Sequence, residues 1–250
     1  MNTRKLFVRL LLTSAAACAF IISVGFASHS QSNMPCSGIV VKIDDEHANA
    51  FVEESDIRQM VQNKFGSLVG SPISSINISL LEKIINTNPF ISDAEVFSTI
   101  DGKIVIEVKQ RIPVLRVMNY SNETFYIDKD GVFMPSSDKF TARVPVASGF
   151  IFDTEKEKAV RMSSIVNTAD TTEKSATEKL FNIISFVRGN EFWNSEVQQL
   201  YVNAAGEIEM IPRVGSHSVI LGDDKYLDEK FKKLLAFYKE GLNKDRKSVV

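Results

Sequence analysis

Residues 88–117, NPFISDAEVFSTIDGKIVIEVKQRIPVLRV, limit the fold of this chain more than any other stretch does. An apolar helical stripe upstream stops at Asn88-Pro89, because the residue before a proline avoids the helical region. Two short strands follow on either side of Asp101-Gly102, a pair typical of a type I′ hairpin turn. This order predicts the end of a small βααββ module. Such modules bind other proteins and do not transform substrates.

The beginning of the same module lies upstream. We expect a first strand at Gly38–Asp44 and a first helix from about Ser55, taken as its N-cap. A second helix is expected to begin at a capping box made by Ser79 and Glu82. The last strand alternates apolar and polar side chains, which indicates one buried face made by Ile104, Ile106 and Val108. The sequence therefore predicts a three-stranded sheet covered by two helices.

The second half predicts a mostly antiparallel β domain that carries helices. Strands are expected at Leu115–Asn119, Thr124–Asp128, Val144–Ala147, Glu196–Val202, Glu207–Ile211 and Ser218–Leu221. A helix capped by Ser175 and Glu178 is expected next, with an apolar stripe made by Leu180, Ile183, Ile184 and Val187. It comes before Trp193, which we expect in the core, with a surface contact as the alternative. A last helix is expected to begin near Asp223-Asp224, since acidic residues suit the positive end of the helix dipole.

The N-terminal segment Leu10–Ala27 is an uncharged run of 18 residues, nearly long enough to cross the ~30 Å hydrocarbon core of a bilayer. Positive charge precedes it, and no Lys or Arg follows until Lys42, which predicts a cytoplasmic N-terminus. Two alternatives stay open, a signal peptide cleaved after Ala27 and a lipoprotein signal at Cys18. All three place most of the chain outside the cytoplasmic membrane.

Taken together, these elements predict an α+β chain with an N-terminal transmembrane helix. The expected parts are a cytoplasmic tail (1–9), a transmembrane anchor (10–27), a linker (28–37), the βααββ domain (38–112), the β domain (113–241) and a short tail (242–250).

Composition and motifs argue against most chemistry. The net charge is −2 and the basic residues are dispersed, so we expect no nucleic-acid partner. Cys18 and Cys36 make neither a disulfide framework nor a zinc motif, and no HExxH, GxSxG or glycine-rich phosphate loop is present. Asp128 and Asp130 resemble the start of a calcium loop but are interpreted as a turn. We expect no enzyme activity, no cofactor and no metal.

Several motifs follow one another in a recognisable order. They are Asn88-Pro89-Phe90-Ile91, Ala94-Glu95-Val96, Gln110-Arg111-x-Pro113, Phe125-Tyr126-Ile127-Asp128, Gly131, Met134-Pro135-x-Ser137, Ala142-Arg143-Val144, Phe192-Trp193, Gln198-Gln199-Leu200-Tyr201-Val202, Glu207-Ile208-Glu209-Met210-Ile211-Pro212-Arg213-Val214-Gly215 and Leu221-Gly222. The βααββ module resembles a POTRA domain. The whole series, over about residues 76–241, resembles the FtsQ/DivIB family of cell-division proteins in the form typical of Bacteroidetes.

The resemblance implies a non-enzymatic divisome scaffold of the inner membrane, with one span and two periplasmic domains. It would act at the division septum, bind FtsB-like and FtsL-like proteins among other divisome components, and support septal peptidoglycan synthesis. In the family, the POTRA region is tied to recruitment and the far end of the β domain to FtsB binding by strand addition. The residues expected to bear on partner binding here are Val219, Ile220, Leu221, Lys230 and Tyr238.

The chain departs from the family pattern at its end, and other functions stay open. The resemblance implies a return strand after the last helix, but Leu242–Val250 is short and polar. One alternative function is a POTRA-type periplasmic chaperone or transport adaptor, which needs a cleaved leader. Another is a periplasmic hydrolase, which needs an activated Ser, Asp or His.

Overall fold

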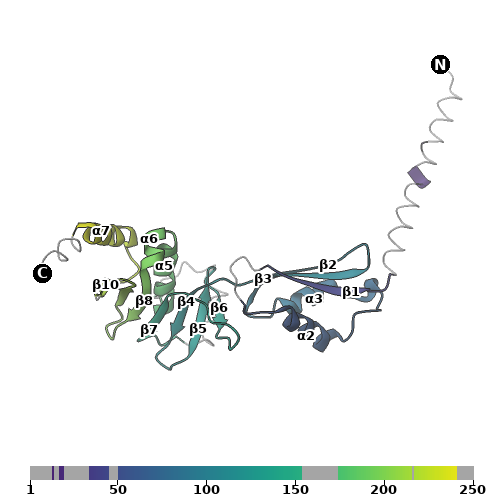
Figure 1. Cartoon of the computed structure of the whole chain (residues 1–250), viewed down its shortest axis with the longest axis horizontal. Coiled ribbons are helices and arrows are strands. Elements are labelled where there is room, and N and C mark those ends of the chain that lie inside the picture. Colours follow the sequence, from purple (N-terminus) through teal and green to yellow (C-terminus); the bar gives the residue numbers. More distant parts are fainter. Residues whose placement is uncertain are drawn as a thin grey trace, which may run out of the picture. The chain divides into compact units, whose positions relative to one another are not determined.

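A computed structural model describes residues 13, 17–19, 34–44, 50–153, 174–215 and 217–240 of the chain (Figure 1). The predicted anchor, residues 10–27, lies mostly outside this part, as does the tail 242–250. Among the described residues, no helix is both long and apolar enough to cross a membrane. The chain divides into two compact units, each described separately below. The second begins at Arg111 and also includes residues 49–51.

The first unit has the predicted βααββ order. Its elements are β1 (Gly38–Asp44), α2 (Glu54–Phe65), a short 3-10 helix (Ile73–Ser75), α3 (Ile78–Ile85), β2 (Ile91–Ser98) and β3 (Lys103–Gln110). The described strands form one sheet in the order β1-β3-β2, in which β1 is parallel and β2 antiparallel to β3. Both helices lie on one face of this sheet (Figure 1). Apolar side chains from the helices and the strands are buried in the unit.

The two helix caps predicted for the first unit are wrong. The N-cap of α2 is Glu53, whose backbone N–H donates to the Asp56 carboxylate at 3.0 Å, and Ser55 lies inside the helix. The N-cap of α3 is Asn77, whose side-chain oxygen accepts from the Leu80 N–H at 2.9 Å, so Ser79 makes no capping box. The N-cap of each helix thus lies two residues earlier than expected, because a neighbouring polar residue satisfies its first free N–H groups.

The hairpin between β2 and β3 also differs from the prediction. Gly102 has a φ of +80°, but Asp101 does not lie in the left-handed region. A type I′ turn requires positive φ at both central residues. The loop instead closes one residue wider, where the Gly102 N–H donates to the Thr99 carbonyl at 3.1 Å and the Thr99 N–H to the Lys103 carbonyl at 2.9 Å.

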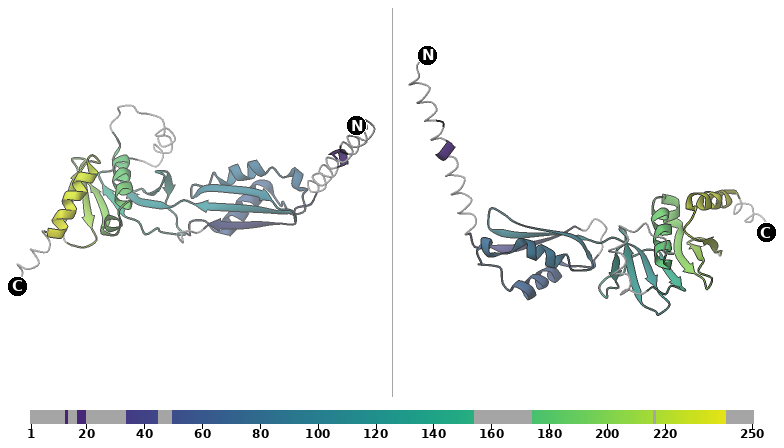
Figure 2. Two further views of the ribbon diagram at one scale, coloured as in Figure 1. Left: turned by 90° about the horizontal axis from the view of Figure 1, so that it is seen from above. Right: turned by 180° about the vertical axis from the view of Figure 1, so that it is seen from behind.

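The second unit is a larger sheet with helices. Its elements are β4 (Pro113–Met118), β5 (Thr124–Asp128), β6 (Phe133–Pro135), β7 (Val146–Gly149), α5 (Ala176–Arg188), α6 (Glu191–Glu196), β8 (Val197–Val202), β9 (Ile208–Pro212), β10 (Val219–Gly222) and α7 (Leu227–Glu240). The described strands form one sheet in the order β10-β9-β8-β7-β4-β5-β6. Figure 2 shows this unit in two further views. The two pairings of β7, with β4 and with β8, are parallel, and the outer pairings are antiparallel. The predicted β-rich domain is therefore mixed at its centre.

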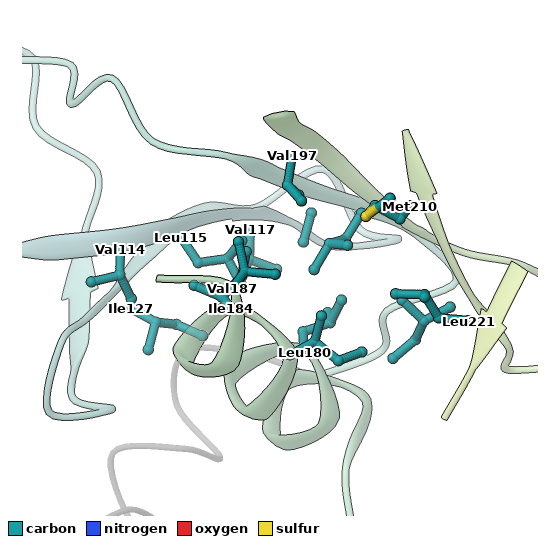
Figure 3. Packing of buried hydrophobic residues seen from close by; sticks show 14 of the residues in the cluster. Val114, Leu115, Val117, Ile127, Leu180, Ile184, Val187, Val197, Met210 and Leu221 are labelled. Atoms are coloured by element: carbon teal, nitrogen blue, oxygen red, sulfur yellow. The ribbon is translucent and has the colours of Figure 1, made fainter. Parts of the chain in front are cut away.

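Helix α5 supplies much of the second core. Ser175 caps it as predicted, because its hydroxyl accepts from the Glu178 N–H at 3.3 Å while the Glu178 carboxylate accepts from the Ser175 N–H at 2.8 Å. Its predicted apolar stripe is fully buried: Leu180, Ile183, Ile184 and Val187. Figure 3 shows this helix against side chains from β4, β8, β9 and β10. Trp193 is buried in the same core, as predicted, but it lies on α6, a helix the pattern did not predict.

Candidate protein-binding edge

Strand β10 ends the second sheet on one side. Its backbone pairs with β9, with Val219 opposite Met210 and Ile220 opposite Glu209, and the described residues place no strand beyond it. A strand with one unpaired edge presents free N–H and C=O groups, which can pair with an extended segment from another chain.

A bulge decides which side chains this edge shows. The register shifts between Ile220 and Gly222, so that Leu221 is the extra residue. Leu221 packs into the core, whereas the side chain of Ile220 is 66% exposed. Gly222 then takes a φ of +76°, a conformation that glycine adopts without strain. The edge therefore offers one large apolar side chain beside its backbone groups.

The turn after β10 is held by two aspartates. The Lys230 ammonium donates to the Asp223 carbonyl oxygen at 2.9 Å and to its carboxylate at 2.7 Å. The Asp224 carboxylate accepts from Lys174 and from Asn182 of α5, each at 2.6 Å. The expected helix start at this pair is therefore wrong: α7 begins at Leu227. Both aspartates lie before the helix, and the acidic residues of its first turn are Asp228 and Glu229.

These contacts shift the acidity of both carboxyl groups. The hydrogen bond from Lys230 lowers the pKa of Asp223. Burial acts to raise the pKa of Asp224, but the hydrogen bonds from Lys174 and Asn182 and the charge of Lys174 outweigh it, so that this pKa is also lowered. Both groups thus favour the ionised form that fixes the turn.

Helix α7 contacts the core through Phe231, and Tyr238 lies near its end. The Tyr238 hydroxyl hydrogen-bonds with His217 Nε2 at 2.8 Å, and its ring meets Trp193 edge-on at 5.7 Å between centroids. Burial raises the pKa of this hydroxyl, and the Glu196 carboxylate raises it further. The rings of Phe192 and Phe237 also lie beside Tyr238, and both are exposed. An exposed aromatic surface therefore surrounds a half-buried tyrosine.

The structure separates the five residues that the sequence proposed for partner binding. Ile220 is exposed at the edge and Val219 is half-buried beside it, whereas Leu221 lies in the core. Lys230 is paired with Asp223, and Tyr238 with His217. Sequence reasoning missed Phe192 and Phe237. The position of Phe192 next to Trp193 in the sequence could have drawn attention to it. The short helix α6 was not predicted, however, so the sequence did not indicate which of the two rings faces solvent.

The acidic turn at Asp128 has a structural role. Its carboxylate accepts from the Asp130 N–H at 3.0 Å, from the Val132 N–H at 2.6 Å and from the Arg111 guanidinium at 2.8 Å. The Asp128 carboxylate thus stabilises the turn and pairs with the Arg111 guanidinium. This agrees with the interpretation of the motif as a turn. The part of the chain that the structure describes contains no group of three metal-ligating side chains.

The fold and the open edge define a two-unit protein with a POTRA-type first module and a β-rich second module. A family model for POTRA-like domains matches residues 34–109, and one described as FtsQ/DivIB, C-terminal related, matches residues 112–248. The second match covers more than half of the chain, which therefore belongs to the FtsQ/DivIB C-terminal-related family. No curated protein matches the sequence.

Membership confirms the resemblance noted in the sequence. The FtsQ/DivIB family is a family of non-enzymatic cell-division proteins, and membership supports a role in cell division for this chain.

Proposed function

We propose that this chain is a divisome scaffold that binds an FtsB-like and an FtsL-like protein outside the cytoplasmic membrane and so supports septal peptidoglycan synthesis. In this proposal residues 1–9 are cytoplasmic, residues 10–27 anchor the chain in the inner membrane as a single span, and residues 28–37 are a linker. Residues 38–112 and 113–241 then act in the periplasm at the division septum.

The observation that carries the proposal is the unpaired edge of β10, with Ile220 exposed beside it. A partner segment added to this edge gains backbone hydrogen bonds along the strand and an apolar contact with Ile220. The exposed rings of Phe192 and Phe237 offer further apolar contact, and aromatic residues are enriched where interfaces gain most of their energy.

The test uses full-length protein in dividing cells. A fluorescent fusion is expected at midcell, and the affinity-tagged chain is expected to co-purify with the FtsB-like and FtsL-like proteins. In Ile220→Glu, a charge is desolvated against the added strand, so recovery of both partners should fall by about tenfold or more.

The matched control is Ile220→Thr, which keeps a β-branched side chain and is expected to retain most of the binding. Because Ile220 is exposed, neither substitution should move the unfolding free energy by more than about 0.5 kcal/mol. Peripheral signal in dividing cells, or equal recovery of partners by both variants, would contradict the proposal. An intact mass that lacks residues 1–27 would favour the transport-adaptor alternative.

A further inference from the structure

Residues 36 and 37, just before β1, hydrogen-bond to two loops of the first unit. The Cys36 N–H donates to the Ser71 carbonyl and the Gly70 N–H to the Cys36 carbonyl, both at 2.8 Å. On the other side, the Ser37 N–H donates to the carbonyl of Gly102, at the tip of the β2–β3 hairpin, also at 2.8 Å. Figure 1 shows this hairpin tip at the end of the unit where β1 begins. Residues 34–37, the loop at 68–72 and the hairpin tip therefore make up one end of the unit.

Each of these loops exposes an apolar side chain. Ile100, in the hairpin tip, is 82% exposed, and Val69, next to Gly70, is 54% exposed. A single exposed apolar residue is common on protein surfaces and needs no explanation. Among the described residues of the first unit, Leu80 and Phe97 are also exposed, at 43% and 40%. Val69 and Ile100 are more exposed than these, and they lie on the two loops that hydrogen-bond to Cys36 and Ser37.

The charges at the hairpin tip are paired. The Lys103 ammonium lies 2.7 Å from the Asp101 carboxylate, and the Thr99 hydroxyl donates to the same carboxylate. These contacts hold the pKa of Asp101 at about 2, so the pair carries one negative and one positive charge at neutral pH. The tip therefore presents no net charge from these two side chains to a neighbouring surface.

The sequence limits how far this end can lie from a membrane. Ala27, the last residue of the proposed anchor, is seven residues before Met34. Seven residues span at most about 25 Å when fully extended. The loops that carry Val69 and Ile100 hydrogen-bond to residues just beyond Met34, so they stay close to the bilayer in every conformation of the linker.

We propose that this end of the first unit docks onto the lipid bilayer, with Ile100 and Val69 inserted at the boundary between headgroups and acyl chains. The inference rests on the proposed membrane anchor. Two apolar side chains alone bind a bilayer weakly, but the short tether keeps them at a high local concentration next to it. In the docked arrangement strand β3 runs away from the membrane, because it begins at Lys103, beside the hairpin tip, and ends at Gln110.

The test uses the full-length chain in phosphatidylcholine vesicles that carry a doxyl quencher near the headgroup. In a Cys18→Ser background, Ile100→Cys is labelled with an environment-sensitive fluorophore. Cys36 stays in place because it is buried, with only 1% of its surface exposed. The matched control is Lys109→Cys, also exposed, at the other end of β3 and about 20 Å from Lys103 by strand rise. The label at position 100 is expected to lose fluorescence in doxyl vesicles, and the label at position 109 to keep it.

Equal quenching of the two labels in doxyl vesicles that retain the protein would contradict the docking proposal but not the proposed anchor. Release of the protein from vesicles by alkaline carbonate would overturn the anchor, and the docking with it. A second variant checks the contact without moving the label. With the fluorophore on Val69→Cys, the added substitution Ile100→Asp is expected to abolish quenching, whereas unchanged quenching at position 69 would contradict a contact shared by the two loops.

Discussion

Asp224 is a half-buried residue whose side chain is only 4% exposed. Its carboxylate joins the turn before α7 to Asn182 of α5 and to Lys174, which comes just before that helix. Both partners lie more than 40 residues earlier in the chain, and the position of α7 therefore depends on the charge of one side chain.

This arrangement predicts a pH dependence. The pKa of Asp224 is lowered in the folded state, so its ionised form stabilises the fold above the unfolded value of about 3.9. That contribution is lost as the pH falls through and below about 4. In urea unfolding of the detergent-solubilised chain, Asp224→Asn should lower the unfolding free energy at pH 7 by about 1–3 kcal/mol. The difference from the original chain should shrink toward pH 3.

Asp228→Asn is the control, because Asp228 is exposed in the first turn of α7. It should change stability by less than about 0.5 kcal/mol at either pH. A constant difference between Asp224→Asn and the original chain from pH 7 to pH 3 would mean that the carboxylate charge does not hold the turn.

At the scale of elements, strand β7 joins the two antiparallel parts of the second sheet, because it pairs in parallel with β4 on one side and with β8 on the other. Its last residue, Gly149, has a φ of +105°. A Cβ atom there would lie 2.2 Å from the Val202 carbonyl oxygen and 2.8 Å from the Tyr201 ring. The pairing of β7 with β8 thus requires glycine at this position for two reasons, backbone conformation and space.

Gly149→Ala is therefore expected to destabilise the second unit by about 2–4 kcal/mol, because the β7–β8 contact must open. Gly206→Ala is the matched control. Gly206 also has a positive φ, +79°, but a Cβ there meets nothing within 4 Å, so only conformational strain of about 1–2 kcal/mol is expected. Thermal unfolding followed by Trp193 fluorescence measures both. Equal losses would show that the close approach to Val202 is relieved without cost.

At the scale of the whole molecule, the chain divides into two compact units. The core around α5 draws all of its buried residues from the second unit. Ile106 belongs to the first unit, where it is fully buried on the central strand β3. We therefore expect the first unit to unfold without unfolding the second.

Ile106→Asp is expected to unfold the first unit, because a buried, unpaired carboxylate costs about 4 kcal/mol or more. Far-UV circular dichroism should lose the signal of that unit. The single tryptophan of the chain, Trp193, lies in the second unit and should keep its emission. Ile100→Asp, the same substitution at an exposed site, should leave both signals unchanged. A red shift of Trp193 emission in Ile106→Asp would show that the second unit depends on the first.

Local patterns were sufficient for the elements that local physics controls. The capping box at Ser175, the stripe of α5 and the extent of β1 depend on residues a few positions apart, and all were predicted. The caps of α2 and α3 were misplaced because several polar residues compete within two positions, and only the folded backbone selects one. The same limit applies to the hairpin at Gly102, where the loop closes at Thr99 rather than at the two residues with the strongest turn signal.

The sequence by itself determined the βααββ module, the buried faces of β3 and α5, and the family of this protein, because these depend on periodicity and on motifs read along the chain. Only the tertiary structure decided that β7 pairs in parallel on both sides, that the bulge exposes Ile220 and buries Leu221, and that Lys230 and Tyr238 are held by Asp223 and His217. Those outcomes depend on how separate segments of the chain pack and pair in the folded protein, and a linear pattern does not record that packing.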